Sequence, residues 1–440
     1  MPHSATAKTS NSHNPSPTVN VIWWVQPDSL RLDDQPGLQQ LDPNANLLVV
    51  FCYPVLTDWL DVGFSRRSQK RIDFEHQGLS ALNAALKQYG QRLYISNQPA
   101  ESLLAELARQ LNARILTTEP NGFDEKQRLK QVRNRLEKIN PSQLTICPGN
   151  SLFRGDLLPF DPSEPPGIFS QFRRQIERNQ TPVAAPINPP AYLPPPPAVI
   201  PKPLTPFIDR PTARLRFNGG AAAAQQAMDK YLADHQAVLS YKQTRNALMG
   251  THQSSQLSPW LAQGSLSVRR FWHSIAEFEH RIAANESTYW LKFELLWREF
   301  FRWITHAHGA KLFNWQGLSD KKPRGEQRFD LTLLARWQQG NTGFGLVDAG
   351  MRELAETGFT SNRARQNMAS CLIHEMGLDW RLGAAWFEHC LLDYDVASNW
   401  GNWCYLAGVG NDPRPQRRFN LKKQAEIYDP KGLFQQRFLS

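Results

Sequence analysis

Residues 287–304 read STYWLKFELLWREFFRWI, a segment in which aromatic and charged side chains recur at helical spacing. Ser287 can cap the start of a helix here, because its hydroxyl can accept a hydrogen bond from a free backbone N–H. One stripe along this helix would consist of Trp290, Glu294, Trp297 and Phe301. Apolar residues also cover most of the remaining circumference, so the pattern predicts a helix that is buried on nearly every side.

Glu294 is unusual in such a helix. An ionised carboxylate in apolar surroundings costs several kcal/mol unless it has a partner. Two interpretations remain open. Glu294 pairs with Arg298, one turn further along, inside an ordinary core, or it faces a ligand.

A second segment, residues 391–405, combines carboxylates with tryptophans. It reads LLDYDVASNWGNWCY and sets Asp393 and Asp395 beside a polar, glycine-containing run. Ordinary cores avoid this mixture. Together the two segments favour a ligand site inside a helical domain.

Three motifs carry a resemblance to a known family: FELLWREFFRW at 293–303, TGFTSNRARQN at 357–367 and LLDYDVASNWGNW at 391–403. They resemble the photolyase/cryptochrome family, and most of all its cryptochrome-DASH branch. The likeness runs from about Val19 to the C-terminus and is densest after Tyr241. It implies an α/β N-terminal domain, an all-α FAD-binding C-terminal domain, and FAD as the cofactor.

The pattern in the N-terminal part independently predicts the same α/β class. Short apolar runs indicate strands at 19–25, 47–53, 92–95, 114–118 and 143–147. Segments such as 68–89 and 124–139 between them have helical periodicity, which predicts a doubly wound parallel sheet. No GxGxxG follows the first strand, so a nicotinamide cofactor is not indicated.

The chain divides into four parts. Residues 1–18 are expected to be a disordered tail, 19–150 an α/β domain, 151–217 a Pro-rich connector, and 218–440 a helical domain. Eleven of the 25 residues from Pro182 to Pro206 are proline, which favours an extended connector. In the last part, long amphipathic segments lie at 267–283, 287–305, 328–339, 346–357, 361–376 and 380–392.

The net charge of +10 favours a polyanionic partner. The excess is uneven, because residues 1–150 carry 16 Lys and Arg against 14 Asp and Glu. Residues 413–425 hold five basic residues and no acid, which indicates either a nucleic-acid contact or a solvated face.

The cysteines and the hydropathy of the chain argue against several classes of protein. The five cysteines are scattered and contain no CxxC pair, which argues against a disulfide framework and against a metal site. No apolar run approaches the ~20 residues of a membrane helix, and the N-terminus lacks the apolar core of a secretory signal. We therefore expect a cytoplasmic protein with no membrane contact, and a monomer.

The FAD phosphates have a candidate site in SSQLSP, residues 254–259. Its serines and free backbone N–H groups at a helix start suit a diphosphate, although a simple N-cap has the same pattern. The resemblance implies that this element binds FAD. By the same match the cofactor-binding residues are Tyr241, Ser254, Ser255, Gln256, Leu257, Ser258, Arg298, Asn362, Arg365, Asp393, Tyr394, Asp395 and Asn399.

Around the flavin ring, the resemblance implies specific roles. Arg365 pairs with Asp393 beside the isoalloxazine, and a buried Arg and Asp do need one another. Asp395 lies near the polar edge of the flavin, and Asn399 lies opposite N5. An amide there cannot readily supply a proton to a flavin radical anion, which favours full reduction over a stored neutral radical.

Substrate contacts follow from the same match. The implied catalytic residues are Glu294, Asn362, Trp297 and Tyr405, and Arg245 and Arg363 would meet the nucleic-acid backbone. Trp297 and Tyr405 could hold bases by stacking, while Glu294 would hydrogen-bond a carbonyl edge. Duplex photolyases have tryptophan where this chain has Tyr405, which implies a preference for lesions that are already unstacked.

An electron relay through tryptophans is also implied. Trp403 and Trp380 match its inner two members, and the alternative is that both are core residues. The outer member would fall ten residues before Trp337, where this chain has Gln327. The nearest replacement in sequence is Trp315.

The antenna motifs depart from the family pattern. The chain reads WWVQPDSLRLDD where the family has a sequence like WFRNDLRLHD. Glu119 falls where the family has its folate-contacting glutamate, but the flanking residues differ. A 5,10-methenyltetrahydrofolate antenna is compatible with Glu119, and the altered motif argues against a requirement for it.

The sequence thus indicates a deoxyribodipyrimidine photo-lyase of cryptochrome-DASH type. Light-driven electron transfer from reduced FAD would repair cyclobutane pyrimidine dimers, chiefly in single-stranded DNA, with duplex DNA or RNA as further partners. The alternative is a blue-light photoreceptor or nucleic-acid-binding regulator without repair activity, because the same motifs would serve it. A third interpretation is a divergent protein with neither role.

Overall fold

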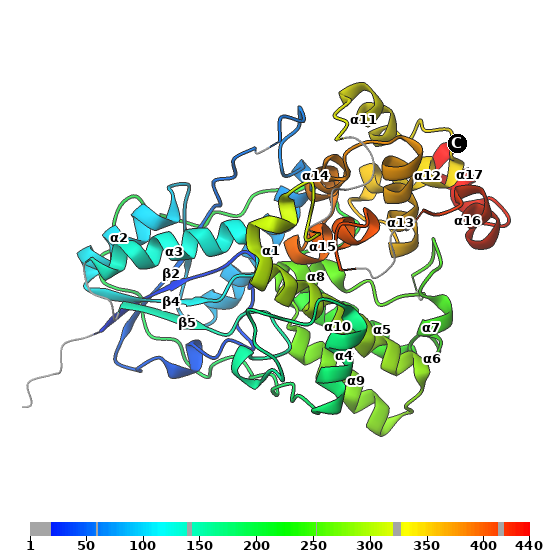
Figure 1. Ribbon diagram of the computed structural model, residues 1–440. Coiled ribbons are helices and arrows are strands. Elements are labelled where there is room, and N and C mark those ends of the chain that lie inside the picture. The colour runs from blue at the N-terminus through cyan, green and yellow to red at the C-terminus, as the bar shows by residue number, and fades with distance from the viewer. Residues whose placement is uncertain (1–18, 59, 139–142, 252, 320–326, 412–417) are drawn as a thin grey trace, which may run out of the picture.

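The computed structural model describes residues 19–58, 60–138, 143–251, 253–319, 327–411 and 418–440. The expected tail at 1–18 lies outside these residues. Figure 1 shows a sheet-containing half, on the left, beside a larger helical half. The first helix, α1 (Gln69–Lys87), lies close to the boundary between them.

The sheet has the predicted strands: β1 (Asn20–Trp24), β2 (Asn46–Cys52), β3 (Leu93–Ser96), β4 (Ala113–Thr118) and β5 (Leu144–Cys147). They pair in parallel in the order β5-β4-β1-β2-β3, and β6 (Thr205–Pro206) adds to β3 antiparallel at the edge. The predicted doubly wound sheet is confirmed. Its strand order reverses direction at β1, which is the switch point of such sheets.

Both faces of the sheet are covered. One set of alternating strand residues, including Val21 and Val49, packs with Leu79 and Leu82 of α1. The opposite set packs against α2 (Ala100–Leu111) and α3 (Phe123–Glu137). Because successive side chains of a strand point to opposite faces, strands that are apolar throughout must be buried on both sides.

The connector is partly folded. Residues 182–206 form no helix, in keeping with their proline content. The carbonyl of Pro195 accepts from the backbone N–H of Leu47 in β2 at 2.8 Å, and Thr205 and Pro206 pair with the edge strand β3. Proline suits this edge position because it has no N–H to donate. Earlier in the connector, α4 (Phe169–Arg178) packs its aromatic residues into the core of the helical half.

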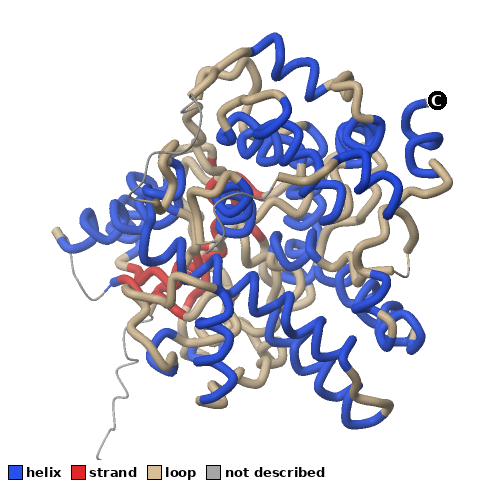
Figure 2. The backbone as a smooth tube through the Cα atoms, turned by 45° about the vertical axis from the view of Figure 1, so that its right-hand side comes forward, coloured by secondary structure: helices blue, strands red, loops and turns tan. Residues whose placement is uncertain are grey.

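The helical half contains the predicted amphipathic segments (Figure 2). Its helices are α5 (Ala221–Ala233), α6 (His235–Leu239), α7 (Tyr241–Thr244), α8 (Ser258–Gln263), α9 (Val268–Arg281), α10 (Glu286–His308), α11 (Leu331–Gln338), α12 (Gly345–Thr357), α13 (Asn362–Ser370), α14 (Trp380–Cys390), α15 (Val396–Leu406), α16 (Leu421–Tyr428) and α17 (Leu433–Leu439). The segment predicted as one helix at 361–376 continues beyond α13 as a π-helical turn, Cys371–Glu375.

The expected cap of α10 was wrong. Asn285 is the N-cap, and its side chain accepts hydrogen bonds from the backbone N–H groups of Ser287 and Thr288. Ser287 instead donates its hydroxyl to Gln243 and accepts from the backbone N–H of Lys242. Its side chain therefore joins α10 to α7.

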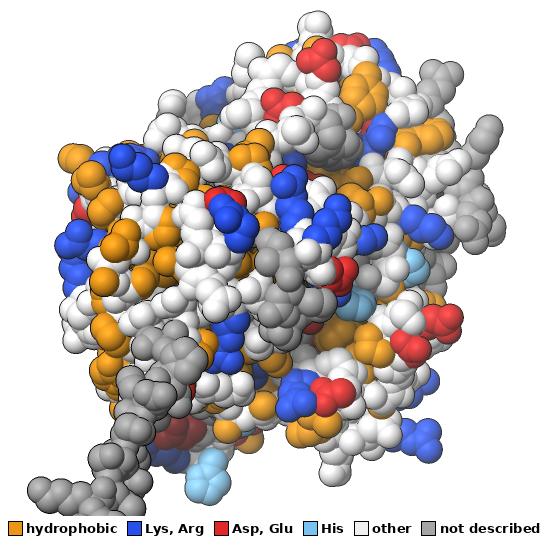
Figure 3. Space-filling view, turned by 90° about the vertical axis from the view of Figure 1, so that its left-hand side faces the viewer, with side chains coloured by type: hydrophobic (Ala, Val, Ile, Leu, Met, Phe, Trp, Pro, Cys, Tyr) orange, Lys and Arg blue, Asp and Glu red, His pale blue; other side chains and the backbone are white. Residues whose placement is uncertain are grey.

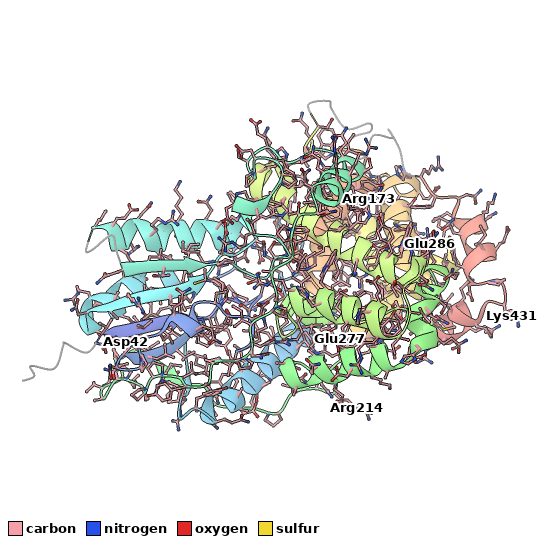
Figure 4. All side chains as sticks on the ribbon, turned by 90° about the horizontal axis from the view of Figure 1, so that it is seen from below. Asp42, Arg173, Arg214, Glu277, Glu286 and Lys431 are labelled. Carbon is pink, nitrogen blue, oxygen red and sulfur yellow. The ribbon has the colours of Figure 1, made fainter. Side chains whose placement is uncertain are left out.

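Helix α10 is the centre of the helical half, as its apolar circumference predicts. It packs closely on α15, where a Cβ on Gly401 would lie 2.3 Å from Phe301. Only glycine permits that approach. Figure 4, in which Glu286 marks the start of α10 and Asp42 the far end of the sheet half, shows side chains filling the space between the halves.

A buried polar network joins the two halves. Arg269 donates to Asp34 at 2.9 Å, with their side chains only 5% and 1% exposed. Ser267 also donates to Asp34, and Arg31 donates to the carbonyl of Gly264 at 2.8 Å. The altered N-terminal motif therefore supplies the residues that hold the α/β half against the helical half.

The face of the molecule seen in Figure 3 does not carry charge of a single sign. On the face seen in Figure 3, Lys and Arg are scattered among apolar and acidic side chains. Of the predicted basic run, Arg414 and Arg417 lie outside the described residues, and Arg418 pairs with Glu375 at 3.0 Å. Within the described ranges, no helix is long and apolar enough to cross a bilayer.

Candidate functional site

The main cavity lies inside the helical half. It measures about 460 Å³, within the range of roughly 300–1,000 Å³ typical of small-molecule sites. Sixteen predicted site residues line it: Tyr241, Arg245, Ser254, Ser255, Gln256, Leu257, Ser258, Glu294, Trp297, Arg298, Asn362, Arg363, Arg365, Asp393, Asp395 and Tyr405. An adjoining lobe of about 90 Å³ adds Tyr394, Asn399 and Trp403. The fold therefore brings together residues spread over more than 160 positions.

Asp393 is the polar centre of this cavity. Arg365 donates to its Oδ2 at 2.9 Å, so the predicted ion pair is present. Ser258 donates to the same oxygen at 2.7 Å, so this hydroxyl is already engaged within the protein. The other carboxylate oxygen, Oδ1, is buried and has no hydrogen-bond partner among the described residues. Such an atom is available to a ligand donor.

Asp395 is held by arginines of α10. Arg302 donates to it at 3.3 Å, and its own side chain caps α15 by accepting from the N–H of Ser398. Burial opposes the ionisation of Asp395, but Arg302 and Arg298 outweigh it and keep the pKa of the carboxyl below its usual value. Asp395 therefore stays charged in the cavity wall.

Glu294 does not pair with Arg298. Its partner is Arg245, the residue that follows α7, and both line the cavity. Arg298 instead donates to the carbonyl of Asn150 at 3.0 Å and contacts Glu299. Burial lowers the pKa of Arg298 to about 10, so its guanidinium remains charged at neutral pH.

Trp297 is stacked on one face. Phe169 of α4 lies parallel to it, with ring centroids 3.7 Å apart and an interplanar angle of 10°. Tyr405 meets Trp297 edge-on at 5.8 Å. The predicted aromatic pair is thus present at the cavity wall, and Phe169 fixes the plane of the tryptophan.

Arg363 lies where α13 meets the C-terminal segment. Its guanidinium stacks 4.5 Å from the ring of Tyr428 and donates to Asn246 at 3.0 Å. The neighbouring Asn362 is exposed and also lines the cavity. Both residues therefore face the open side of the site.

Around the small lobe, tryptophans fill the space between α14 and α15. Asn399 donates to the carbonyl of Ala384 at 3.0 Å, which fixes its amide at the lobe. Trp403 packs against Gly383, where a Cβ would lie only 2.2 Å from the indole. Trp380 is buried next to Trp400, with ring centroids 5.8 Å apart.

Tyr394 closes the lobe toward the sheet half. Arg71 of α1 stacks 4.5 Å from its ring, and its hydroxyl accepts from the indole of Trp400 at 3.2 Å. Burial raises the pKa of Tyr394 well above its usual value, so the phenol is neutral.

Some cavity residues were missed from sequence. Glu353 of α12 lines the cavity and pairs with Arg216 at 3.1 Å. Burial raises the pKa of Glu353 against the opposing effect of Arg216. The only sequence signal was a glutamate at a buried position of an amphipathic helix. Gln253 adds a buried carbonyl oxygen that has no partner among the described residues.

Glu119 lies elsewhere, between the two halves. It lines a separate cavity of about 220 Å³ together with Lys126 and His306. Its carboxylate is half exposed and 3.9 Å from His306. Over the described ranges, no cluster of His, Cys, Asp and Glu has the makings of a metal site, and all five cysteines are buried thiols.

Two family models match the chain. One, the FAD binding domain of DNA photolyase, matches residues 290–440, and the other, DNA photolyase, matches residues 21–195. A cryptochrome DASH from Idiomarina loihiensis is 40% identical over 423 residues, which cover 93% of this chain and 91% of that protein. One from Gloeobacter violaceus is 38% identical over 437 residues, covering 96% and 86%.

Solved structures of a cryptochrome and a photolyase also match the fold. The crystal structure of Synechocystis sp. PCC6803 cryptochrome matches with a TM-score of 0.88 and 35% identity, covering 96% of this chain and 89% of that one. A class III photolyase from Agrobacterium tumefaciens matches with a TM-score of 0.82 and 25% identity, covering 98% and 88%.

The cavity suits the cofactor of these domains. Asp393 Oδ1 and Gln253 Oε1 offer acceptors that the protein leaves unpaired among its described residues, and Arg298 supplies positive charge. FAD has N–H and O–H donors for these two acceptors and an anionic diphosphate for the arginine. Identity of 38–40% over nearly the whole chain, with both family models matched, makes this protein a member of the photolyase/cryptochrome family, in its cryptochrome-DASH branch.

Proposed function

We propose that this protein repairs cyclobutane pyrimidine dimers in single-stranded DNA by light-driven electron transfer. FAD, when bound and reduced, supplies the electron that opens the dimer and receives it back. The proposal rests on one observation: a single cavity is lined both by Asp393, in the proposed cofactor region, and by Glu294, Trp297 and Tyr405, in the proposed substrate region. A base admitted to the second region would therefore lie beside the first.

The residues of the substrate region would make different contacts with the dimer. Trp297, held by Phe169, offers a rigid aromatic edge and face for a base, and stacking of this kind contributes ~1–3 kcal/mol per base. Glu294 offers a hydrogen bond to the polar edge of the dimer. Asn362, which the family resemblance implies lies between flavin and substrate, lines the same cavity and can donate or accept a hydrogen bond.

The preference for single strands is supported by energetics. A dimer must leave its stack to enter a cavity, and in a duplex this costs a few kcal/mol of unpairing and unstacking. Tyr405 is smaller than tryptophan and already makes an edge contact with Trp297. The site therefore has less stacking area with which to extract a paired lesion.

The test is a repair assay on protein whose absorption spectrum has been recorded. Oligonucleotides with one cyclobutane dimer are supplied single-stranded, in duplex DNA and as the RNA equivalent, each with light and dark arms. We expect light-dependent repair that is fastest on single-stranded DNA. Binding of FAD and DNA without repair in any light arm would overturn the proposal in favour of a photoreceptor or regulator.

A further inference from the structure

The ion pair between Arg245 and Glu294 occupies the substrate region, and the following inference rests on the function proposed above. Each side chain is partly accessible from the cavity, with 26% of Arg245 and 32% of Glu294 exposed. Among the described residues, the Arg245 guanidinium hydrogen-bonds Glu294 alone. A phosphate that reaches this cavity would meet an arginine whose remaining N–H groups are unused.

Arg245 is placed for an anion. It lies 5.3 Å from the ring of Trp290, and Arg363 is close enough to repel it electrostatically. Burial lowers the pKa of Arg363, and the charge of Arg245 adds to this effect. The guanidinium groups of Arg245 and Arg363 thus interact electrostatically, and both line the cavity, which leaves positive charge there that a backbone phosphate can neutralise.

Glu294 depends on Arg245 for its charge. Burial raises the pKa of Glu294, and Arg245 opposes this rise. From α7 the phenol of Tyr241 also faces Glu294, and it is a buried neutral group that supplies no positive charge. On α10 itself, Arg298 directs its N–H groups to backbone carbonyls of Asn150 and Leu261. Without Arg245, the carboxylate would therefore lose its main compensation.

We propose that nucleic-acid binding exchanges this pair: a backbone phosphate takes Arg245, and Glu294 takes up one proton from solvent and donates it as a hydrogen bond to a base carbonyl. No covalent bond changes. The carboxylate becomes a carboxylic acid, and the phosphate keeps its charge beside the guanidinium.

The exchange makes binding depend on pH in one direction. When Arg245 turns to a phosphate, the pKa of Glu294 is higher in the complex than in the free protein. Binding then takes up protons between those two values, and affinity falls as the pH rises through them, by at most about tenfold per pH unit.

Proton uptake can be counted without light or repair. FAD-loaded protein is titrated in the dark with a dimer-containing single strand by calorimetry, in two buffers of different ionisation enthalpy at one pH. Affinity is then measured from pH 6 to 8.5. We expect uptake of a fraction of a proton by the wild type, and none by Glu294→Gln.

Glu286→Gln is the matched control. Glu286 lies on the same helix (Figure 4) and pairs with Lys242 of α7, but it does not line the cavity. This variant should keep the proton uptake and the pH dependence of the wild type. If a group other than Glu294 took up the proton, Glu294→Gln would still show proton uptake on binding.

The outcomes separate the two proposals. Tight binding by the wild type with no proton uptake, or equal uptake in Glu294→Gln, overturns the exchange and leaves repair intact. Absence of any single-strand binding overturns the proposed function and the exchange with it. Zero proton uptake by the wild type overturns the exchange even if Glu294→Gln does not fold.

Discussion

Trp380 donates its indole N–H to the backbone carbonyl of Trp315 at 3.0 Å. Trp380 is buried, whereas Trp315 is only partly buried and so lies nearer the surface. Gln327, which occupies the expected outer position of the relay, is exposed in a loop. The contact places the backbone of Trp315 beside the indole of Trp380, so Trp315 is the residue that we propose to test as the outer member.

Replacing Trp403 by Phe should strongly slow photoreduction of oxidised FAD. Trp403 lines the small lobe beside Asn399 and is the first tryptophan of the inferred path. Phenylalanine keeps an aromatic ring in the core but is much harder to oxidise. Flash photolysis with an external reductant measures the rate, and repair that starts from chemically reduced FAD should survive. Unchanged photoreduction would contradict the inner relay.

Replacing Trp315 by Phe tests the exit separately. The hydrogen bond from Trp380 goes to a backbone carbonyl, so Trp315→Phe keeps this contact and removes only the oxidisable ring. We expect slower photoreduction than in the wild type and faster decay of the light-induced radical. Trp272→Phe on α9 is the control. If both variants behave like the wild type, the electron leaves by another route.

Replacing Gly383 by Ala should move Trp403. The new methyl group would lie 2.2 Å from the indole, which forces the ring or the helix to shift. Overpacking of this kind costs ~1–3 kcal/mol, measurable by urea unfolding, and it should also change tryptophan fluorescence. Gly167→Ala is the control, because nothing lies within 4 Å of its added methyl. Equal stability of the two variants would contradict the close packing.

The elements and the cofactor region were largely predictable from sequence, for local reasons. Strand runs that are apolar throughout specify a sheet covered on both faces, and amphipathic periodicity located the helices of the second half. The Arg365–Asp393 pair followed from motif resemblance together with the mutual need of two buried charges. Each of these signals is contained in a short segment or in a match to a family.

Partners across the tertiary structure were not predictable. Spacing on α10 offered Arg298 to Glu294, yet the partner is Arg245, 49 residues earlier in sequence. The stacking of Phe169 on Trp297 depends equally on how the connector returns across the helical half. An i,i+4 pattern reports adjacency on one helix and contains no information about which other helix packs there.

Binding of single-stranded DNA should weaken steeply with salt, because phosphate contacts release counterions. Arg363→Gln should reduce the slope of log affinity against log salt by about 0.7, the value for one contact on a single strand. Arg281→Gln is the control, since that arginine is 70% exposed and pairs with Glu277 outside the cavity. A slope equal to that of the wild type would remove Arg363 from the nucleic-acid contacts.

The pairing of Asp34 with Arg269 should be a major source of stability between the halves. Asp34→Asn leaves the guanidinium of Arg269 buried without its carboxylate, which typically costs about 3–5 kcal/mol. The backbone at Asp34 has φ 53°, which asparagine also tolerates, so the change isolates the charge. Asp33→Asn is the control, because the Asp33–Arg270 pair is 17–24% exposed and its loss should cost less than the loss of the fully buried pair.

The same pair predicts how the loss of unfolding free energy in Asp34→Asn, relative to the wild type, depends on pH. Burial opposes the ionisation of Asp34, but Arg269 outweighs it and holds the pKa of the carboxyl below its usual value. A depressed pKa stabilises the folded state above the unfolded value of about 3.9, and this contribution is lost as the pH falls through the folded value. We therefore expect urea unfolding, measured from pH 6 down to 3, to give a constant difference in unfolding free energy between wild type and Asp34→Asn above about pH 5. Below pH 4 this difference should become smaller. A gap independent of pH over that range would mean that Asp34 acts through packing alone, without its charge.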